Sequence, residues 1–285
     1  MTQPADENIR EKRLPDAIII GAAKAGTSVL KRNLLLHPDV KGRKYEEIRF
    51  FNRYFEKGLP WYIEQMEPVT RDEIAIEKTN YFSYRNAIQR IWQVFGNNIK
   101  LILIVRDPVQ RLISNYAMMF ENKVINGTFK KLTFTEINGK LTVNAKYYNV
   151  QNSYYAKWLN MWLDTGFKLS TFMIIDGDEF AKDPLPELIK LEQFLGLRHM
   201  LTKETFYFNE TKGFPCVAPN FTFADGTKSN VKGGCAEEKC GRKHPDVPFD
   251  QLELLYQHFA PLNQEFFDLV GMDIPDWNMK KTVKI

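Results

Sequence analysis

The chain has 285 residues, of which 44% are hydrophobic and 26% are charged, and this ordinary composition excludes a disordered chain, a collagen and a coiled coil. Lys and Arg number 39 against 35 Asp and Glu, so the net charge of +4 argues against a polycation that coats nucleic acid but leaves room for a local anion site. No apolar run reaches the roughly 18 residues of a transmembrane helix, and residues 1–16 lack the apolar core of a signal peptide. We therefore expect a cytosolic protein, or one that has lost a leader or an anchor.

Short apolar runs alternate with longer amphipathic stretches along most of the chain. Buried strands are predicted over residues 17–20, 74–76, 101–105 and 172–175. Helices are predicted over residues 27–37, 85–95, 108–120, 154–165 and 184–195. This order predicts a single-domain α/β fold over residues 15–285, with a P-loop-like, doubly wound parallel sheet flanked by helices, after a flexible segment at residues 1–14.

The stretch over residues 205–247 has a different composition and contains all three cysteines of the chain, Cys216, Cys235 and Cys240. We expect a long stapled loop or a hairpin there, because loops of this length are usually functional or disordered. The cysteine spacing fits neither a paired zinc motif nor a disulfide-dense scaffold, so either one local disulfide leaves a free thiol or the three thiols are unrelated. A closing helix is predicted over residues 252–269, interrupted or bent at Pro261.

Residues 21–28, with the sequence GAAKAGTS, lie between the first predicted strand and its helix. Small residues let the backbone approach a ligand closely, and the start of a helix offers free N–H groups to an anion. Lys24 adds a positive charge, and Thr27 and Ser28 add hydroxyl groups. We interpret the segment as a phosphate cradle, although Lys24 precedes the second glycine instead of following it as in a Walker A motif. The alternative is a plain strand–helix turn with a solvated lysine.

Arg106 follows the most apolar predicted strand, at the kind of position where ligands bind in open α/β sheets. Pro108 suits the first turn of the next helix, and Ser114 lies two turns along that helix. Arg106 either binds an anion or pairs with a carboxylate. Because Lys24 and Lys78 also stand where predicted strands end, three cations at three strand ends indicate a polyanionic cofactor.

Glu47 stands among four basic residues, Lys41, Arg43, Lys44 and Arg49. A carboxylate in such surroundings is either a member of a salt bridge or a general base. A second basic run, Gly241-Arg242-Lys243, follows Cys240. It is either a solvated charged loop or an anion-binding loop that the nearby cysteines hold in place.

Taken together, these motifs resemble those of the heparan sulfate sulfotransferases, from about residue 15 to residue 277. Residues 20–27 resemble the 5′-phosphosulfate loop of that family, and Arg106-Asp107-Pro108 with Arg111 and Ser114 resembles its 3′-phosphate motif. Residues 175–178 (IDGD) and 206–214 (FYFNETKGF) look closest to the glucosaminyl 3-O-sulfotransferases. Residues 46–52 (EEIRFFN) look more like the N-sulfotransferases, because Arg49 and Asn52 stand where the 3-O branch has histidine and aspartate.

The resemblance implies an enzyme that transfers a sulfuryl group from 3′-phosphoadenosine 5′-phosphosulfate (PAPS) to a glucosamine of heparan sulfate at its 3-hydroxyl, leaving PAP and needing no metal. The alternatives are an N-sulfotransferase and a glycosaminoglycan-binding protein of this fold with little turnover. A P-loop-like kinase is disfavoured, because the lysine-after-glycine order and a clear acidic strand end are missing.

The resemblance also assigns roles to individual residues. It makes Glu47 the general base and gives Lys24 and Lys78 catalytic roles. It places cofactor contacts at Lys24, Ala25, Gly26, Thr27, Ser28, Arg106, Ser114, Cys240, Gly241, Arg242, Lys243 and His244. It places acceptor contacts at Lys41, Arg43, Lys44, Arg49 and Asn52. It implies a disulfide between Cys216 and Cys235, with Cys240 free.

The implied partner is heparan sulfate or a related anionic glycosaminoglycan. We expect a monomer that contacts neither nucleic acid nor, through this segment, a membrane. Its compartment would be the Golgi lumen if an N-terminal anchor has been removed, and otherwise the cell exterior or the cytoplasm. Asn-x-Ser/Thr sequons at Asn126, Asn209 and Asn220 give weak support to a secretory route.

Overall fold

The computed structural model of the chain describes residues 9–43, 47–235, 244–274 and 277. Packing divides the chain into two units. The first unit comprises residues 1–22, 26–105 and 165–236, and the second comprises residues 23–25, 106–164 and 237–285.

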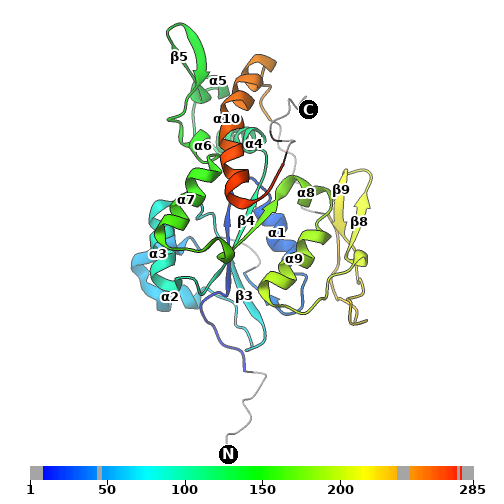
Figure 1. Ribbon diagram of the computed structural model, residues 1–285. Helices are drawn as coiled ribbons and strands as arrows, with labels where there is room; N and C mark the ends of the chain where they lie inside the picture. Colours follow the sequence, from blue (N-terminus) through cyan, green and yellow to red (C-terminus); the bar gives the residue numbers. More distant parts are fainter. Residues whose placement is uncertain (1–8, 44–46, 236–243, 275–276, 278–285) are drawn as a thin grey trace, which may run out of the picture. The chain divides into compact units, whose positions relative to one another are not determined.

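A five-stranded parallel sheet lies at the centre of the first unit (Figure 1). Its strands, in spatial order, are β2 (Val40–Lys41), β3 (Ile74–Lys78), β1 (Ala17–Gly21), β4 (Lys100–Val105) and β7 (Phe172–Asp176). The apolar residues of β1 and β4 are fully buried, as expected of parallel strands that are covered on both faces. The predicted α/β class with a parallel sheet is confirmed, and the strand that sequence inspection missed, β2, has only two residues.

Helices cover both faces of this sheet (Figure 1). On one side lie α2 (Gly58–Glu64) and α3 (Arg85–Phe95), and on the other lie α1 (Thr27–Leu34) and α9 (Leu185–Leu195). Shorter helical segments complete the unit: η1 (Phe50–Tyr54), η2 (Phe55–Lys57), η3 (Leu169–Thr171), α8 (Gly177–Lys182) and η4 (Lys203–Thr205). The layered arrangement directs the carboxyl ends of β1, β3 and β4 to one edge of the sheet, since the three strands run parallel.

Helix α1 is shorter than predicted, because it ends at Leu34 and not at His37. The N–H groups of Leu36 and His37 turn back to the carbonyls of Asn33 and Leu34, so the last residues form tighter turns before Pro38. The helix therefore ends about one turn before the position at which Pro38 predicts its end.

The predicted stapled segment begins with a hairpin of β8 (Phe206–Asn209) and β9 (Phe214–Val217). A disulfide joins Cys216 in β9 to Cys235, as the resemblance implied. Cys240 lies outside the described residues. The hairpin is thus covalently tied to the chain that follows it.

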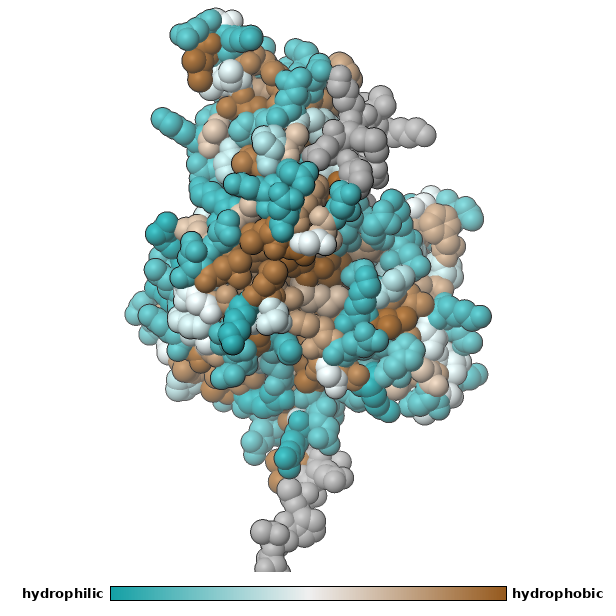
Figure 2. All heavy atoms as spheres, viewed as in Figure 1, coloured by the Kyte–Doolittle hydropathy of each residue, from teal (hydrophilic) through white to brown (hydrophobic). Residues whose placement is uncertain are grey.

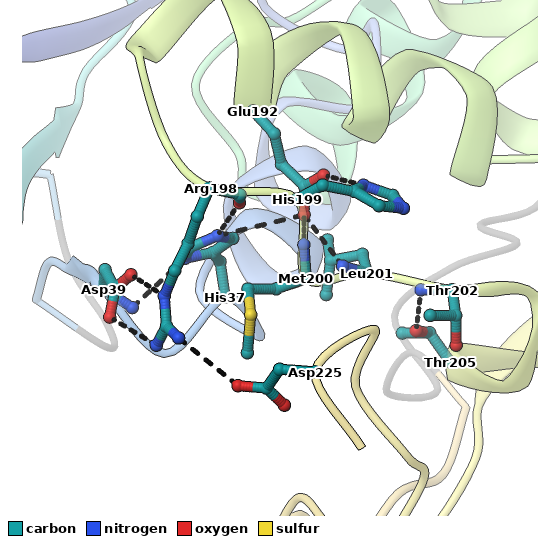
Figure 3. A network of polar contacts seen from close by, with 10 residues as sticks. All are labelled: His37, Asp39, Glu192, Arg198, His199, Met200, Leu201, Thr202, Thr205 and Asp225. Atoms are coloured by element: carbon teal, nitrogen blue, oxygen red, sulfur yellow. Dashed lines mark hydrogen bonds and ion pairs between the residues drawn. The ribbon is translucent and has the colours of Figure 1, made fainter. Parts of the chain in front are cut away.

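A polar network anchors the segment after α9 to the turn after α1, within the first unit (Figure 3). His37 Nε2 contacts the Arg198 carbonyl at 2.9 Å, and the Arg198 guanidinium donates to both carboxylate oxygens of Asp39. Buried Glu192 accepts the N–H groups of Met200 and Leu201 and contacts His199 Nδ1 at 2.7 Å. These contacts fix the chain between α9 and β8 at several points.

The second unit is mostly helical, with one small hairpin. Its elements are α4 (Pro108–Glu121), α5 (Phe129–Thr133), β5 (Phe134–Ile137), β6 (Lys140–Val143), α6 (Tyr148–Gln151), α7 (Tyr155–Thr165) and α10 (Phe249–Val270). Its core packs α4 against α10, with Leu112, Leu255 and Phe259 fully buried. The β5–β6 hairpin carries hydrophilic side chains mixed with hydrophobic ones on the face shown in Figure 2.

Helix α10 runs without interruption from Phe249 to Val270 and keeps Pro261 in its interior. The prediction of a helix near the end of the chain is confirmed, the helix is several residues longer than predicted, and the interruption predicted at Pro261 does not occur. No helix in the described part of the chain is long and apolar enough to cross a membrane.

Candidate active site

The predicted base Glu47 is held between two cations in the first unit. Lys78 Nζ donates to Glu47 Oε1 at 2.7 Å, and Arg49 Nε donates to Glu47 Oε2 at 3.4 Å. Lys78 is the last residue of β3, and its side chain is 14% exposed against 23% for Glu47. Each carboxylate oxygen keeps a further lone pair, so Glu47 can still accept a proton or a hydrogen bond.

A buried carboxylate, Glu77, lies directly before Lys78 in the same strand, and sequence reading gave it no role. The hydroxyls of Thr79, Tyr81 and Tyr62 donate to it at 2.6, 2.8 and 2.5 Å. Burial raises the pKa of Glu77, and these three hydrogen bonds offset part of that rise. Alternation along a strand sends Glu77 and Lys78 to opposite faces, so the cage fixes the strand end that presents Lys78.

An aromatic cluster supports the segment that carries Glu47 and Arg49. The Phe50 and Tyr62 rings stack at 4.4 Å, and Phe51 packs edge-on against Tyr81 at 5.5 Å. Arg49 has a φ of 56° and directly precedes the five-residue π-helix η1, so the chain turns sharply there. Such π-turns are often found at functional sites, but the one-letter pattern FFNRY gave no signal of it.

A cleft of about 890 Å³ opens beside the Glu47–Lys78 pair. Its lining is rich in cations and comprises Arg10, Ser28, Lys31, Arg32, Leu35, Val40, Lys41, Gly42, Glu47, Glu67, Pro68 and Lys78. A concave site with five basic side chains and two carboxylates suits an anionic ligand that offers a proton to Glu47.

Only some of the predicted acceptor residues line this cleft. Lys41 lines it and also pairs with Glu73 at 3.3 Å. Arg43 instead donates to the Gln65 side chain at 3.3 Å, and Arg49 donates to Glu47. Asn52 lies in η1, where its Oδ1 is buried with no hydrogen-bond donor among the described residues. Lys44 lies outside the described residues, so its predicted contact stays a prediction.

The predicted phosphate loop follows β1 and has the backbone of a tight turn. Gly21, Lys24 and Gly26 have φ angles of 152°, 72° and 107°, and Gly26 directly precedes α1. A Cβ on Gly21 would come within 2.8 Å of the Asn80 side chain, so only glycine fits there. Gly26, the N-cap residue of α1, has no side chain that could cap the first N–H groups of the helix, the helix end that favours an anion.

The second predicted motif begins where β4 ends. Asp107 caps α4, since its side chain accepts the N–H groups of Val109 and Gln110 at 2.8 and 3.3 Å. Tyr256 donates to the other Asp107 oxygen at 3.1 Å, and Tyr155 donates to the Arg106 carbonyl at 2.9 Å. The backbone that carries Arg106 is therefore fixed on both sides.

Arg111 of the same motif is fully buried, and hydrogen bonds hold its guanidinium within the second unit. Its Nε donates to Ser153 Oγ at 2.7 Å, and its Nη2 donates to the Asn149 carbonyl at 2.5 Å. Burial lowers the pKa of Arg111 from its usual value. Ser114, one turn further along α4, is half-buried.

Lys24 and Arg106 lie near His244 within the second unit. Burial, followed by the charges of Arg106 and Lys24, lowers the pKa of His244. The three residues therefore lie near enough to repel added positive charge, which is the electrostatic condition for binding an anion. The predicted cofactor residues Cys240, Gly241, Arg242 and Lys243 lie outside the described residues.

The model of the sulfotransferase domain family matches residues 14–268. The chain belongs to the sulfotransferase family. Mouse heparan sulfate glucosamine 3-O-sulfotransferase 3B1 is 37% identical over 263 residues, which are 92% of this chain and 65% of that protein. Human heparan sulfate glucosamine 3-O-sulfotransferase 6 is 36% identical over 92% of this chain and 73% of its own length. The resemblance drawn from the motifs is thereby confirmed.

A solved sulfotransferase from Alicyclobacillus acidocaldarius shares the fold of this sulfotransferase chain. The two align with a TM-score of 0.67 and 21% sequence identity, over 94% of this chain and all of the other. The chain spans about 65% of the length of the mouse relative named above. Within the described residues, no group of three or more His, Cys, Asp or Glu side chains could hold a metal ion.

Proposed function

We propose that this protein transfers a sulfuryl group from PAPS to a glucosamine of heparan sulfate, at the 3-hydroxyl. The observation that carries the proposal is the Glu47–Lys78 pair at a cation-lined cleft of about 890 Å³. Relatives named as heparan sulfate glucosamine 3-O-sulfotransferases match 92% of the chain and support the choice of acceptor.

Glu47 would take the proton of the attacking hydroxyl. Lys78 and Arg49 hold one carboxylate oxygen each, which keeps the carboxylate oriented toward the cleft. Lys78 is held in turn by the strand end that the buried Glu77 fixes. General-base catalysis by a positioned side chain contributes roughly 100-fold to 10,000-fold in rate.

The residues after β1 and β4 fit a phosphate-rich donor. Gly21 allows close approach of the backbone, and Lys24 and Arg106 supply positive charge that already lowers the pKa of the neighbouring His244. PAPS, when bound, supplies the electrophilic sulfuryl group and a phosphate leaving group. Lys24 would stabilise the negative charge that develops on the leaving oxygen, and Arg106 with Ser114 would hold the 3′-phosphate.

The test is an assay with radiolabelled PAPS and a panel of defined heparan oligosaccharides, followed by mapping of the product. We expect label on the 3-hydroxyl of glucosamine. Label on the amine would assign the N-sulfotransferase alternative. Binding of PAP without any labelled product would leave only the glycosaminoglycan-binding alternative.

We further propose that the protein works as a monomer in the Golgi lumen, or outside the cell. The disulfide between Cys216 and Cys235 supports an oxidising compartment. Asn126 and Asn220 are exposed, whereas Asn209 is half-buried and its amide contacts Cys235 Sγ at 3.5 Å. Glycosylation is therefore expected first at Asn126 and Asn220, which peptide mapping after secretion would test.

A further inference from the structure

Lys31, a residue that belongs to none of the motifs, lines the cleft beside Glu47. It lies on α1, one turn after Ser28, and only 7% of it is exposed. Ser28, Glu47 and Lys78 line the same cleft. A lysine this deeply buried is rare outside ion pairs and binding sites, because burying an ammonium group is costly.

The charges that face Lys31 come from two neighbouring segments. Strand β3 contributes Lys78 and Glu77, and the segment after β2 contributes Arg43 and Glu47. Burial, then Lys78 and Arg43, lower the pKa of Lys31 to about 8, although the two carboxylates oppose that shift. At neutral pH most molecules therefore carry the ammonium, and the fraction that carries it falls as the pH rises past 8.

We infer that Lys31 is a specificity-determining residue that binds an anionic substituent of the acceptor, a sulfate or a carboxylate, near the hydroxyl presented to Glu47. The inference deepens the proposed function and rests on it for the identity of the acceptor. The cleft lining holds five basic side chains, including Lys31 and Lys78, against the two carboxylates of Glu47 and Glu67, so an added anion is attracted.

Anion binding at Lys31 has a consequence for pH dependence. A nearby anion raises the pKa of an ammonium group, so acceptor binding should be accompanied by proton uptake near pH 8. The affinity for the acceptor should accordingly fall as the pH increases from about 7 to 9. Arginine in place of Lys31 would keep its charge throughout this range, because its pKa is above 12.

The experiment measures calorimetric binding of octasaccharides to the PAP-loaded protein at pH 7 and pH 9. The ligands are a fully sulfated heparin octasaccharide and its desulfated form, which retains only the carboxylates. The variants are Lys31→Met, Lys31→Arg and, as a control, Lys190→Met, which changes an exposed lysine of α9. Melting temperatures of all variants report whether they fold.

We expect Lys31→Met to bind the sulfated octasaccharide roughly tenfold or more weakly at pH 7, since a charge-assisted hydrogen bond is lost. The wild type should approach that weak binding at pH 9, whereas Lys31→Arg should bind equally at both pH values. A loss confined to the sulfated ligand assigns sulfate as the substituent, and a loss with both ligands assigns the carboxylate. Lys190→Met should match the wild type.

Binding of the sulfated octasaccharide by folded Lys31→Met within twofold of the wild type would overturn the inference. So would a wild type that binds neither octasaccharide. Charge-dependent binding at Lys31 in a protein that transfers no sulfuryl group would overturn the proposed function while leaving Lys31 as an anion-binding residue. The two proposals can therefore fail separately.

Discussion

At the scale of single residues, the contact that matters most is the 2.7 Å ion pair between Lys78 and Glu47. A partly exposed ion pair contributes on the order of 1 kcal/mol or less to stability, so its geometry points to a chemical role more than to a structural one. Because each Glu47 oxygen accepts from a different cation, the carboxylate is oriented without being fully enclosed.

Glu47→Gln should keep the affinity for PAP and lower turnover roughly 100-fold or more, because glutamine keeps the shape but cannot take a proton at neutral pH. Turnover per folded molecule and the melting temperature should be measured together. Glu46→Gln is the matched control, since it makes the same change one position earlier in the sequence, and it should be nearly neutral. A Glu47→Gln protein with normal turnover would exclude the general-base role.

Lys24→Ala should lower turnover on the order of 100-fold or more, since the charge that offsets the leaving phosphate is lost. Lys24 stands in a tight loop and lies close enough to His244 to lower the pKa of that histidine. Lys190→Ala, an exposed change on α9, serves as the control. Turnover and PAP affinity are the measurements, and near-normal turnover in folded Lys24→Ala would contradict the donor-binding assignment.

At the scale of elements, the apolar strands could be predicted closely, because a parallel strand that is covered on both faces must be apolar throughout. Strand β2 could not be predicted, because a strand of two residues is too short to show an alternating hydrophobic pattern. The π-helix η1 could not either, because its shape depends on the aromatic packing of Phe50 and Phe51 against Tyr62. Glu47 and Lys78 could be proposed from the sequence, but their pairing across 31 residues and the buried cage of Glu77 depend on tertiary structure.

Protonation of His258 in helix α10 should destabilise the folded protein in acid. Burial lowers the pKa of His258, and the Tyr154 hydroxyl contacts its Nε2 at 2.9 Å. Since the folded pKa lies below the unfolded value of about 6.5, protonation favours the unfolded state. The free energy of unfolding should therefore be unaffected by His258 above about pH 6.5 and should decrease as the pH falls from there toward the folded pKa.

Chemical denaturation between about pH 5 and pH 7.5 tests this expectation, with His258→Gln as the comparison. The variant should show a shallower loss of stability in acid. Some pH dependence should remain, because the pKa of His244 is lowered as well. An identical acid dependence in the wild type and in His258→Gln would contradict the assignment.

At the scale of the whole molecule, the first residues that the structure describes are held to the first unit. Glu11 and Val69 exchange two backbone hydrogen bonds of 2.9 Å, and Arg10 pairs with Glu73 at 2.8 Å. Burial alone would raise the pKa of Glu73, but the Thr70 N–H, Arg10 and Lys41 together hold it below its usual value. The sequence predicted a flexible segment over residues 1–14 because polar composition carries no information about such pairing.

Relative to a chain that lacks residues 1–8, deleting residues 1–13 should lower the free energy of unfolding by roughly 2 kcal/mol. The larger deletion removes two backbone hydrogen bonds, each worth about 1 kcal/mol, and the ion pair of Arg10. Equilibrium unfolding in urea measures both proteins against the full chain. Equal stability of the two deletions would show that residues 9–13 contribute nothing.

The adjacency of Glu77 and Lys78 in β3 has a consequence for which sequence changes the protein can tolerate. Register pairs Glu77 with Ile18 and Lys78 with Ile19 of β1, so each side chain has a fixed side of the sheet. An insertion or deletion of one residue within β3 before Glu77 would exchange those sides, placing the Lys78 ammonium beside the Tyr62 hydroxyl and the Glu77 carboxylate beside Glu47. A point substitution in β3 changes one side chain, and a second substitution can compensate for it. A one-residue shift would change the side chains on both faces of the strand at once. We therefore expect the length of β3 to be more strictly constrained than its composition.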